Sequence, residues 1–551
     1  MANTGGEILV QCLEAQGVDR VFCVPGESYL AVLDALHGRS IDVINARHEG
    51  GAAMMAEADG KMTGRPGICM VTRGPGATNA AAGVHIAKQD STPMILFVGQ
   101  IARDMRGREA FQEVDYRQTF GDLAKWVEEI DRADRIPEIL SHAWHIAMSG
   151  RPGPVVLALP EDMLRDIVPN EAGPKVEVAS PAPNRHEVAR FEEMLCQAER
   201  PFLILGGSRW DNDAVAKVQL FAERHNLPVG CSFRRQSLFD NLHPNYAGDV
   251  GLGINPALKE RVATSDLVIL LGARFSENPS QNFSLLDFPK PKQKLVHIHS
   301  GAEELGRIYA PDLAMNATPA SFLDAVQDIE QRPASSNTPE EAHAAYHQWT
   351  DKVPEPVNAD FADAGKIMEQ LRDLLPDNAI MANGAGNYAI WLHRFWRYRQ
   401  YGSQLSPTSG SMGYGLPAAI AGKLRNSDKP VICFAGDGCF QMAGLEFATA
   451  AQTGAAIVVL VFDNGLYGTI RMHQERDYPN RVSATSLTNP DFALLAKACG
   501  GYGELVEKTE EFTAAFKRAT NSGLPSIIHI KTNPDVITPA TTLTKLRNAA
   551  K

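Results

Sequence analysis

Two short motifs in the C-terminal third of the chain place an acid and an amide beside glycines at the ends of apolar runs. Gly436-Asp437-Gly438 follows the run VICFA, and Asn464 ends the next run, 27 positions after Asp437. A carboxylate, an amide oxygen and a nearby main-chain carbonyl form part of an octahedral oxygen site, which Mg²⁺ completes with water and phosphate oxygens. Glycines let the backbone approach such an anion closely. Because no lysine follows them, the pattern predicts a Mg²⁺-bridged diphosphate and not a P-loop.

The same residues have a simpler explanation. In an ordinary strand-to-helix turn, Asp437 would only cap the helix that follows, and GDG alone favours that interpretation. The second strand ending at Asn464 shifts the balance toward a metal site. Residues 74–79 (GPGATN) and 384–389 (GAGNYA) also follow apolar runs, but each matches only half of a GxGxxG dinucleotide motif.

A glutamate in the N-terminal part is the second candidate for chemistry. Glu49 stands in residues 46–60 (ARHEGGAAMMAEADG), where an apolar run gives way to a helix of mostly small and apolar residues. Burial without a cation raises the pKa of a carboxyl group and lets it donate or accept a proton near neutral pH. The alternative is an acid at a helix start, stabilised by the helix dipole. This segment alone does not separate the two.

These candidates need strands whose ends meet at one edge of a sheet. Short β-branched runs, glycine-bearing loops and helical patterns alternate along the chain, which is typical of parallel strands covered on both faces. Ligands of such sheets collect at the carboxyl ends of the strands. The expected strands are residues 21–24, 41–45, 67–71, 93–99, 154–159, 201–207, 266–272, 379–383, 431–436, 456–462 and 526–531.

Two stretches rich in proline, serine and charge, residues 169–184 and 331–341, predict linkers. They divide the chain into predicted domains 1–170, 185–330 and 345–551. A length of 551 residues is enough for three separate cores. We therefore expect an α/β protein with three doubly wound parallel-sheet domains.

Composition narrows the class of protein. The chain is 44% hydrophobic and 21% charged, as in soluble globular proteins, and its net charge of −12 argues against a nucleic-acid or anionic-membrane partner. Its eight cysteines form no CxxC pair and lie mostly in apolar runs, which favours reduced thiols and a cytoplasmic location. Residues 1–17 predict an amphipathic helix, and the apolar runs are too short to span a membrane.

Together these segments resemble the thiamine-diphosphate-dependent decarboxylases and carboligases, most closely the acetolactate synthase large-subunit group. The resemblance covers essentially the whole chain, and GDG followed at this spacing by an Asn-ended strand is that superfamily's cofactor signature. It implies a thiamine-diphosphate-binding fold: an N-terminal pyrimidine-binding domain, a Rossmann-like central domain and a C-terminal diphosphate-binding domain. The other segments that carry it are residues 24–28 (VPGES), 47–58 (RHEGGAAMMAEA), 74–79, 111–113 (FQE), 151–160 (RPGPVVLALP) and 410–422 (GSMGYGLPAAIAG).

The resemblance implies a role for each matching residue. Glu49 is implied to contact the aminopyrimidine ring and to promote the imino tautomer that takes the proton from the thiazolium C2. Met412 is implied to hold the cofactor bent, and the carbonyl of Gly410 to accept a hydrogen bond from the pyrimidine amino group. The implied metal ligands are Asp437, Asn464 and the main-chain carbonyl of Leu466. The other implied cofactor-binding positions are Pro25, Asn79, Gly436, Gly438, Cys439, Tyr467 and Gly468.

The substrate side of the pocket departs from the biosynthetic acetolactate synthases. His473 stands where those enzymes usually carry a tryptophan, and Gly50 replaces a glutamine. FAD, which that group holds in its central domain, is disfavoured: Arg274 is kept, but His299 and Gly301 replace an acidic pair. The implied substrate-side positions are Gln100, Phe111, Gln112, Lys125 and His473.

The resemblance implies thiamine-diphosphate- and Mg²⁺-dependent decarboxylation of a 2-oxo acid, with transfer of the acyl carbanion to a carbonyl acceptor as in acetolactate formation. It also implies a homodimer or homotetramer with sites at the subunit interface. Open alternatives on the same cofactor are a non-ligating 2-oxo acid decarboxylase and another C–C lyase or acyltransferase. Outside this class, a nucleotide-binding α/β protein would bind its ligand without regard to Mg²⁺. A non-catalytic assembly partner would have no need of Glu49.

Overall fold

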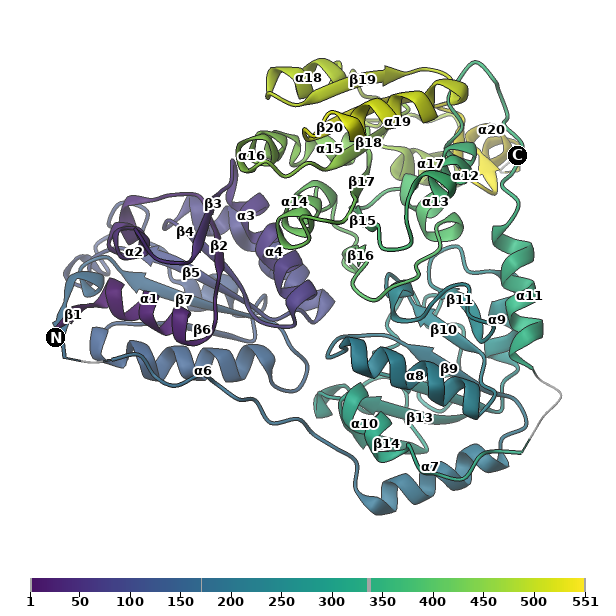
Figure 1. The fold of residues 1–551 in the computed structure, drawn as a ribbon, viewed down its shortest axis with the longest axis horizontal. Helices are drawn as coiled ribbons and strands as arrows, with labels where there is room; N and C mark the ends of the chain where they lie inside the picture. Colours follow the sequence, from purple (N-terminus) through teal and green to yellow (C-terminus); the bar gives the residue numbers. More distant parts are fainter. Residues whose placement is uncertain (1, 170, 334–337, 550–551) are drawn as a thin grey trace. The chain divides into compact units, whose positions relative to one another are not determined.

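The computed structural model describes residues 2–169, 171–333 and 338–549 (Figure 1). The chain folds into two compact units. The first contains the chain up to Ala179 together with Ile420–Arg425 and Leu445–Thr453, and the second contains the remainder. One six-stranded sheet lies in the first unit and two lie in the second, and all neighbouring strands within these sheets are parallel.

The sheet of the first unit has the order β3-β2-β4-β5-β7-β6, so the chain reverses direction across the sheet between β2 and β4. Ligands of doubly wound sheets bind at the carboxyl ends of the strands beside such a reversal. The strands are β2 (Arg20–Cys23), β3 (Asp42–Asn45), β4 (Gly67–Val71), β5 (Met94–Gln100), β6 (Trp126–Glu129) and β7 (Pro154–Pro160). The helices are α1 (Gly5–Ala15), α2 (Leu30–Leu36), α3 (Glu49–Thr63), α4 (Pro75–Asp90), α5 (Tyr116–Phe120) and α6 (Ile136–Met148).

The hydrophobic pattern of the strands follows from helices on both faces. Every residue of β4, β5 and β7 is buried. Ile95 and Phe97 of β5 pack into the core formed with α1, α2 and α6. The intervening Leu96 and Val98 point to the opposite face because strand side chains alternate. Helices α3 and α4 lie against β4 and β5.

Small residues let α3 and α4 approach closely. A Cβ atom added to Gly83 of α4 would lie 2.4 Å from the Cβ and 2.7 Å from the carbonyl carbon of Ala53 in α3. No larger residue fits there without moving one helix. Because Glu49 begins α3 and Asn79 lies in α4, this contact fixes the two candidate residues relative to each other.

The second unit contains the central sheet, with the order β11-β10-β9-β12-β13-β14. Its direction reverses between β9 and β12. The strands are β9 (Pro201–Leu205), β10 (Val229–Ser232), β11 (Tyr246–Val250), β12 (Leu267–Leu271), β13 (Lys294–His299) and β14 (Leu313–Asn316). The helices are α7 (Arg185–Gln197), α8 (Asn212–Arg224), α9 (Pro256–Ala263) and α10 (Pro319–Ala325).

The C-terminal sheet of the second unit has the order β16-β15-β17-β18-β20-β19 and reverses between β15 and β17. Its strands are β15 (Ile380–Asn383), β16 (Gln404–Leu405), β17 (Val431–Gly436), β18 (Val458–Asp463), β19 (Tyr502–Val506) and β20 (Ser526–Lys531). The remaining helices along the chain are α11 (Pro339–Thr350), α12 (Ala364–Leu374), α13 (Tyr388–Phe395), α14 (Gly415–Arg425), α15 (Asp437–Gln441), α16 (Phe447–Thr453), α17 (Gly468–Asp477), α18 (Phe492–Ala498), α19 (Phe512–Asn521) and α20 (Leu543–Ala549). Two short antiparallel ribbons pair β1 (Asn3–Thr4) with β8 (Ile167–Val168) and β21 (Val536–Thr538) with β22 (Thr541–Thr542).

The predicted fold class is confirmed: each of the three sheets is parallel and carries helices on its crossover connections. All eight cysteines are free thiols, and six of them are buried. Of the helices within the described ranges, none combines the length and the apolar composition needed to cross a membrane.

The contact between α3 and α4 gives a stability prediction. We expect Gly83→Ala to lower the free energy of unfolding by about 1–3 kcal/mol, because the added methyl overpacks a filled contact. Helix propensity alone would instead raise the free energy of unfolding of the Gly83→Ala protein by about 1 kcal/mol. Thermal or denaturant unfolding measures the sign, and Ala82→Gly at the neighbouring exposed position calibrates the propensity effect. A Gly83→Ala protein as stable as the parent would contradict the proposed close packing.

Candidate active site

A cavity of about 290 Å³ opens at the carboxyl edge of the C-terminal sheet. Its walls come from the loops after β15, β17 and β18, from the start of α17, and from two flanking segments around residues 357–364 and 532–537. Every position of the second unit that was predicted to bind the cofactor or its metal lines this cavity: Gly410, Met412, Gly436, Asp437, Gly438, Cys439, Asn464, Leu466, Tyr467 and Gly468.

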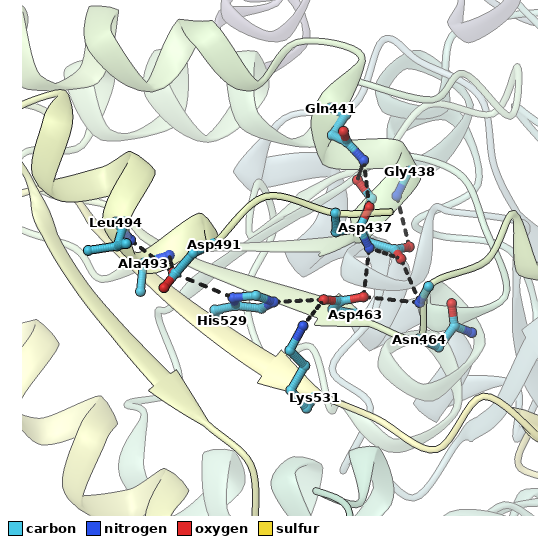
Figure 2. Close-up of polar contacts among 12 residues, drawn as sticks. Asp437, Gly438, Gln441, Asp463, Asn464, Asp491, Ala493, Leu494, His529 and Lys531 are labelled. Carbon is cyan, nitrogen blue, oxygen red and sulfur yellow. Dashed lines mark hydrogen bonds and ion pairs between the residues drawn. The ribbon is translucent and has the colours of Figure 1, made fainter. Parts of the chain in front are cut away.

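Sheet register brings the two predicted metal-binding side chains to the same edge. Strands β17 and β18 are parallel neighbours, with Gly436 opposite Phe462. Asp437 and Asn464 therefore follow the ends of adjacent strands, as the sequence predicted (Figure 2). The Asn464 side-chain oxygen accepts the Leu466 N–H at 3.1 Å, which fixes its orientation.

Asp437 is almost fully buried, and hydrogen bonds hold both of its oxygens. One oxygen accepts the N–H of Gly438 at 2.8 Å. The other accepts the N–H of Gly465 at 2.9 Å and the side-chain amide of Asn489 at 2.7 Å. Burial nevertheless raises the pKa of Asp437 to about 6, and the neighbouring Asp463 carboxylate adds to the rise. A cation at this carboxylate would remove that penalty.

Asp463, the last residue of β18, is a buried acid that the sequence reasoning did not single out. Its side chain shares the Asn489 amide with Asp437, at 2.7 Å, and accepts from His529 at 2.8 Å and Lys531 at 2.5 Å (Figure 2). Burial opposes the ionised form, but the hydrogen bonds from His529, Lys531 and Asn489 outweigh it and lower the pKa of Asp463. Asp463 thus stays charged inside the protein while Asp437 faces the cavity.

The loop after β15 also lines the cavity, although the sequence reasoning gave GAGNYA only a weak dinucleotide match. The Tyr388 hydroxyl accepts the Gly384 N–H at 3.1 Å and donates to the Cys439 sulfur at 3.2 Å. A Cβ on Gly436 would lie 2.8 Å from the Tyr388 ring. The position of this loop after β15, next to the strand-order reversal, was the signal that could have identified it.

The cysteine of the GDGC motif joins three loops of the cavity. Its sulfur accepts the N–H of Gly413 at 3.3 Å as well as the Tyr388 hydroxyl. Gly413 follows the half-buried Met412, so Cys439 fixes the backbone beside that side chain. The backbone at Gly410 has φ +68°, and the space beside its Cα is open.

The first unit collects its candidate residues at the carboxyl ends of three neighbouring strands. Pro25 follows β2, Glu49 follows β3 as the first residue of α3, and Asn79 lies in α4 after β4. The Asn79 amide donates to a Glu49 carboxylate oxygen at 2.9 Å. Glu49 is half-buried, and the eleven residues that follow it in α3 are buried.

A second glutamate holds the backbone just before Glu49. The buried Glu446 carboxylate accepts the N–H of His48 at 2.9 Å and that of Arg47 at 3.1 and 3.2 Å, and the Thr449 hydroxyl donates to it at 2.7 Å. Burial raises the pKa of Glu446, and these three hydrogen-bond donors oppose the rise. The sequence reasoning missed this residue, which lies nine positions after Asp437.

Glu446 also explains the second glycine of the RHEGG motif. A Cβ on Gly51 would lie 2.3 Å from a carboxylate oxygen of Glu446. The Arg47 side chain adds a further link, because it donates to the side-chain oxygen of Gln452 at 2.6 Å. The segment 446–452 therefore fixes the start of α3.

The predicted substrate-side residues of the first unit separate into two groups. Gln100 ends β5 and is buried, with its amide donating to the Val114 carbonyl at 2.9 Å. Phe111 is exposed, and Gln112 packs against Gly74 at the start of α4. Lys125 instead precedes β6, at the amino edge of the sheet, where its amine donates to three carbonyls at the end of α6. The structure therefore does not bring Lys125 to the edge that carries Gln100.

His473, the remaining predicted substrate-side residue, lies in α17 and is half-buried. It is four residues after Thr469, which lines the cavity, so the two residues share one face of the helix. His473 is thus one turn beyond the cavity wall.

In the central sheet, the reversal between β9 and β12 is tightly packed. A Cβ on Gly207 would lie 1.9 Å from the Gly272 carbonyl oxygen. The buried Trp210 indole donates to the Gly206 carbonyl at 2.8 Å, and His299, the last residue of β13, is buried. The loops that would approach a nucleotide at this edge are packed against each other.

The shared amide of Asn489 gives a pH-dependent prediction. Its N–H groups stabilise the ionised carboxylates, so Asn489→Ala is expected to cost about 1–3 kcal/mol when both acids are charged. As the pH falls below the pKa of Asp437, near 6, protonation removes part of this loss. The drop in melting temperature of the metal-free protein should therefore be larger at pH 8 than at pH 5. Gln441→Ala removes the contacts to the Asn489 oxygen and to the Asp437 main-chain carbonyl but no donor to either carboxylate, and it serves as the control; an equal drop at both pH values would contradict the assignment.

The hydrogen bonds from the Arg47 and His48 N–H groups to Glu446, called the Glu446 clamp below, give a second prediction. Glu446→Ala leaves the N–H groups of Arg47 and His48 without their acceptor, and we expect a loss of about 1–3 kcal/mol in unfolding free energy. Thr449→Val, which removes only one donor to the carboxylate, should cost less. Hydrogen exchange of the first turn of α3 should accelerate in Glu446→Ala. Unchanged exchange there would show that the clamp does not fix the helix start.

Comparison with known proteins agrees with this arrangement. Models of the thiamine pyrophosphate (thiamine diphosphate) enzyme domains match residues 3–119 (N-terminal TPP binding domain), 188–326 (central domain) and 384–530 (C-terminal TPP binding domain). The acetolactate synthase isozyme 1 large subunit of Escherichia coli K12 is 31% identical, over 96% of this chain and 94% of its own length. The isozyme 2 large subunit of the same organism is 29% identical over 96% and 95%. The acetolactate synthase of Mycobacterium bovis is 30% identical over 94% and 86%. The chain belongs to the thiamine pyrophosphate enzyme family.

Proposed function

We propose that the protein decarboxylates a 2-oxo acid with thiamine diphosphate and Mg²⁺ and transfers the acyl carbanion to a carbonyl acceptor. The observation that carries the proposal is the single cavity lined by all ten predicted positions of the second unit. The relatives with 29–31% identity over nearly the whole chain are named as acetolactate synthases, which supports a carboligase of this kind.

The donor set fits a hard divalent cation. Asp437 offers a carboxylate whose buried charge lacks a cation, and Asn464 offers an amide oxygen from the adjacent strand. With the carbonyl of Leu466 these groups would hold Mg²⁺, which favours oxygen ligands and keeps positions for water and phosphate. Gly436 and Gly438 let Tyr388 and Tyr467, which also line the cavity, pack against the backbone of the GDG turn, because a Cβ at either glycine would strike the neighbouring ring.

Thiamine diphosphate supplies the nucleophilic carbon and the electron sink for decarboxylation. The chain's own residues would place it and control one proton. Glu49, oriented by Asn79, would exchange a proton with the aminopyrimidine ring. Met412 would support the bent cofactor from the cavity wall and keep water from it. Pro25 would line the pyrimidine side.

The substrate side is proposed from fewer observations. Gln100, Phe111 and Gln112 lie on or beside the loop that follows β5, and His473 lies one turn beyond the cavity wall. FAD stays possible but disfavoured, because His299 and Gly301 replace the acidic pair, and the proposed function does not need it. The domain limits 1–170, 185–330 and 345–551, a homodimer or homotetramer and a cytoplasmic location remain predictions.

The second candidate function is decarboxylation without ligation. This second candidate is kept because His473 stands where acetolactate synthases usually have a tryptophan. That position shapes the pocket for the acceptor. Protein reconstituted with thiamine diphosphate and Mg²⁺ should be incubated with pyruvate and a panel of 2-oxo acids. Acetoin after acid treatment indicates ligation, and acetaldehyde alone would replace the first proposal with this one.

The mechanism is tested at Glu49. We expect Glu49→Gln, which keeps an acceptor for Asn79, to lower kcat by about 10²–10⁴-fold, the usual contribution of acid–base catalysis. Glu138→Gln, an exposed acid of the same unit, is the matched control. Cofactor affinity from fluorescence quenching separates loss of chemistry from loss of binding. Full turnover by Glu49→Gln with every active oxoacid would refute the proposed role.

A further inference from the structure

A pair of histidines far from the cavity described above has an arrangement that calls for a cation. His343 and His347 are four residues apart on α11, so their side chains lie on one face of the helix. Their Nε2 atoms are 3.0 Å apart, and the ring planes meet at 86° with the centroids 4.5 Å apart. Both side chains are half-buried.

The partners of the two rings fix where the protons are. Nδ1 of His343 lies 2.9 Å from the carbonyl oxygen of Tyr246, which can only accept. Nδ1 of His347 lies 3.0 and 3.1 Å from the two carboxylate oxygens of Asp351, which also accept. Each Nδ1 therefore carries the hydrogen, and a neutral imidazole has only one. Both Nε2 atoms then present lone pairs to each other, an arrangement that repels unless a cation lies between them.

Two kinds of cation could resolve the repulsion, a proton or a metal ion. A proton would make one ring an imidazolium. Burial lowers the pKa of His343, and the nearby Arg397, together with any charge on His347 or His243, lowers it further, although the Tyr246 carbonyl opposes this. Asp351 contacts the His347 ring, not that of His343, and it is shared with Arg397. Protonation of His343 near neutral pH is therefore disfavoured.

The geometry suits a metal ion. With metal–nitrogen distances of about 2.0–2.1 Å, nitrogens 3.0 Å apart subtend about 91–97° at the metal. That is the angle between adjacent ligands in the square-planar and octahedral complexes of Cu²⁺ and Ni²⁺. Each imidazole also donates the N–H of its other ring nitrogen, Nδ1, to an oxygen, as metal-binding histidines almost always do.

We propose that His343 and His347 form a binding site for a divalent transition-metal ion with nitrogen preference, Cu²⁺, Ni²⁺ or Zn²⁺. Within residues 2–169, 171–333 and 338–549 no cluster of three or more metal-ligating side chains occurs, so water completes the coordination and binding is weaker than at a structural zinc site. Mg²⁺ and Ca²⁺ are excluded because they take oxygen ligands. The site is independent of the proposed function.

A metal ion bound at this site would stabilise α11 in its position within the second unit. Helix α11 packs against β11, α9 and α13, and Tyr246, the oxygen partner of His343, is the first residue of β11. A bound ion would link two turns of α11 to each other and orient both rings toward their partners. We expect added Ni²⁺ to raise the melting temperature of the unit.

Ni²⁺ is the main probe, because Cu²⁺ also oxidises thiols. The full-length untagged protein, freed of metal and then saturated with Mg²⁺, is titrated with Ni²⁺ by calorimetry. We expect one equivalent to bind at pH 7.5 and the affinity to fall as the pH is lowered, because protons compete with the metal for nitrogen ligands. His347→Gln, which retains an N–H for Asp351, should weaken binding at least tenfold. Asp351→Asn should weaken binding about 10–100-fold, because an amide oxygen is a weaker acceptor for the Nδ1–H of His347 than a carboxylate.

His243→Gln, a neighbour outside the pair, is the matched control and should bind as the parent does. Melting temperatures in EDTA establish that each variant is folded, and Zn²⁺ or Cu²⁺ must compete with Ni²⁺ for the same equivalent. The proposal is overturned if His347→Gln binds Ni²⁺ as tightly as the parent. It is equally overturned if the parent binds no Ni²⁺ and NMR shows the two rings sharing a proton at pH 7.5.

Discussion

One amide group between two buried carboxylates determines the geometry of the C-terminal cavity. Asn489 donates to Asp437 and Asp463 at 2.7 Å each, and without this donor two like charges would face each other at the ends of adjacent strands. His529 and Lys531 hold Asp463 from the far side with hydrogen bonds, and Lys531 supplies a positive charge. Asp437 is left directed toward the cavity. The protein thus keeps one acid ionised with its own hydrogen-bond donors, and the other acid is open to a cation from solution.

A similar arrangement occurs in the first unit, where the position of Glu49 depends on a second, buried acid, Glu446. Glu446 accepts the backbone N–H groups of Arg47 and His48, and Glu49 follows directly. Asn79 then orients the Glu49 carboxylate. In both units a residue proposed for chemistry follows a parallel strand, while a second polar residue, distant in sequence, fixes its position. The supporting residues satisfy buried polar groups, so their loss affects stability as well as function.

Sequence patterns were sufficient to predict those strands and site residues that are marked by the residue types of a short segment. Fully apolar runs such as those of β4 and β17 identified the central strands, and GDG with Asn464 identified the cavity wall. Several strands were missed. The edge strand β6 (WVEE) is only half-buried along its length and resembles a surface segment. The inner strands β10 (VGCS) and β13 (KLVHIH) are almost entirely buried, but small or polar residues interrupt their apolar pattern. Asn489 and Glu446 could not be predicted, because their importance comes from contacts made in three dimensions. Lys125 was predicted to line the pocket from its resemblance alone. It lies at the amino edge of the sheet, and the resemblance did not reveal which edge carries it.

The division of the chain between the two units has a consequence for its synthesis. The first unit includes Leu445–Thr453, which carries Glu446, yet most of that unit ends at Ala179. Some 270 residues must therefore be translated after Ala179 before the last piece of this unit emerges. At about 5–20 residues per second this takes roughly 15–55 s. During that interval the start of α3 lacks its acceptor, so the nascent N-terminal unit reaches its final form only after most of the second unit has been made.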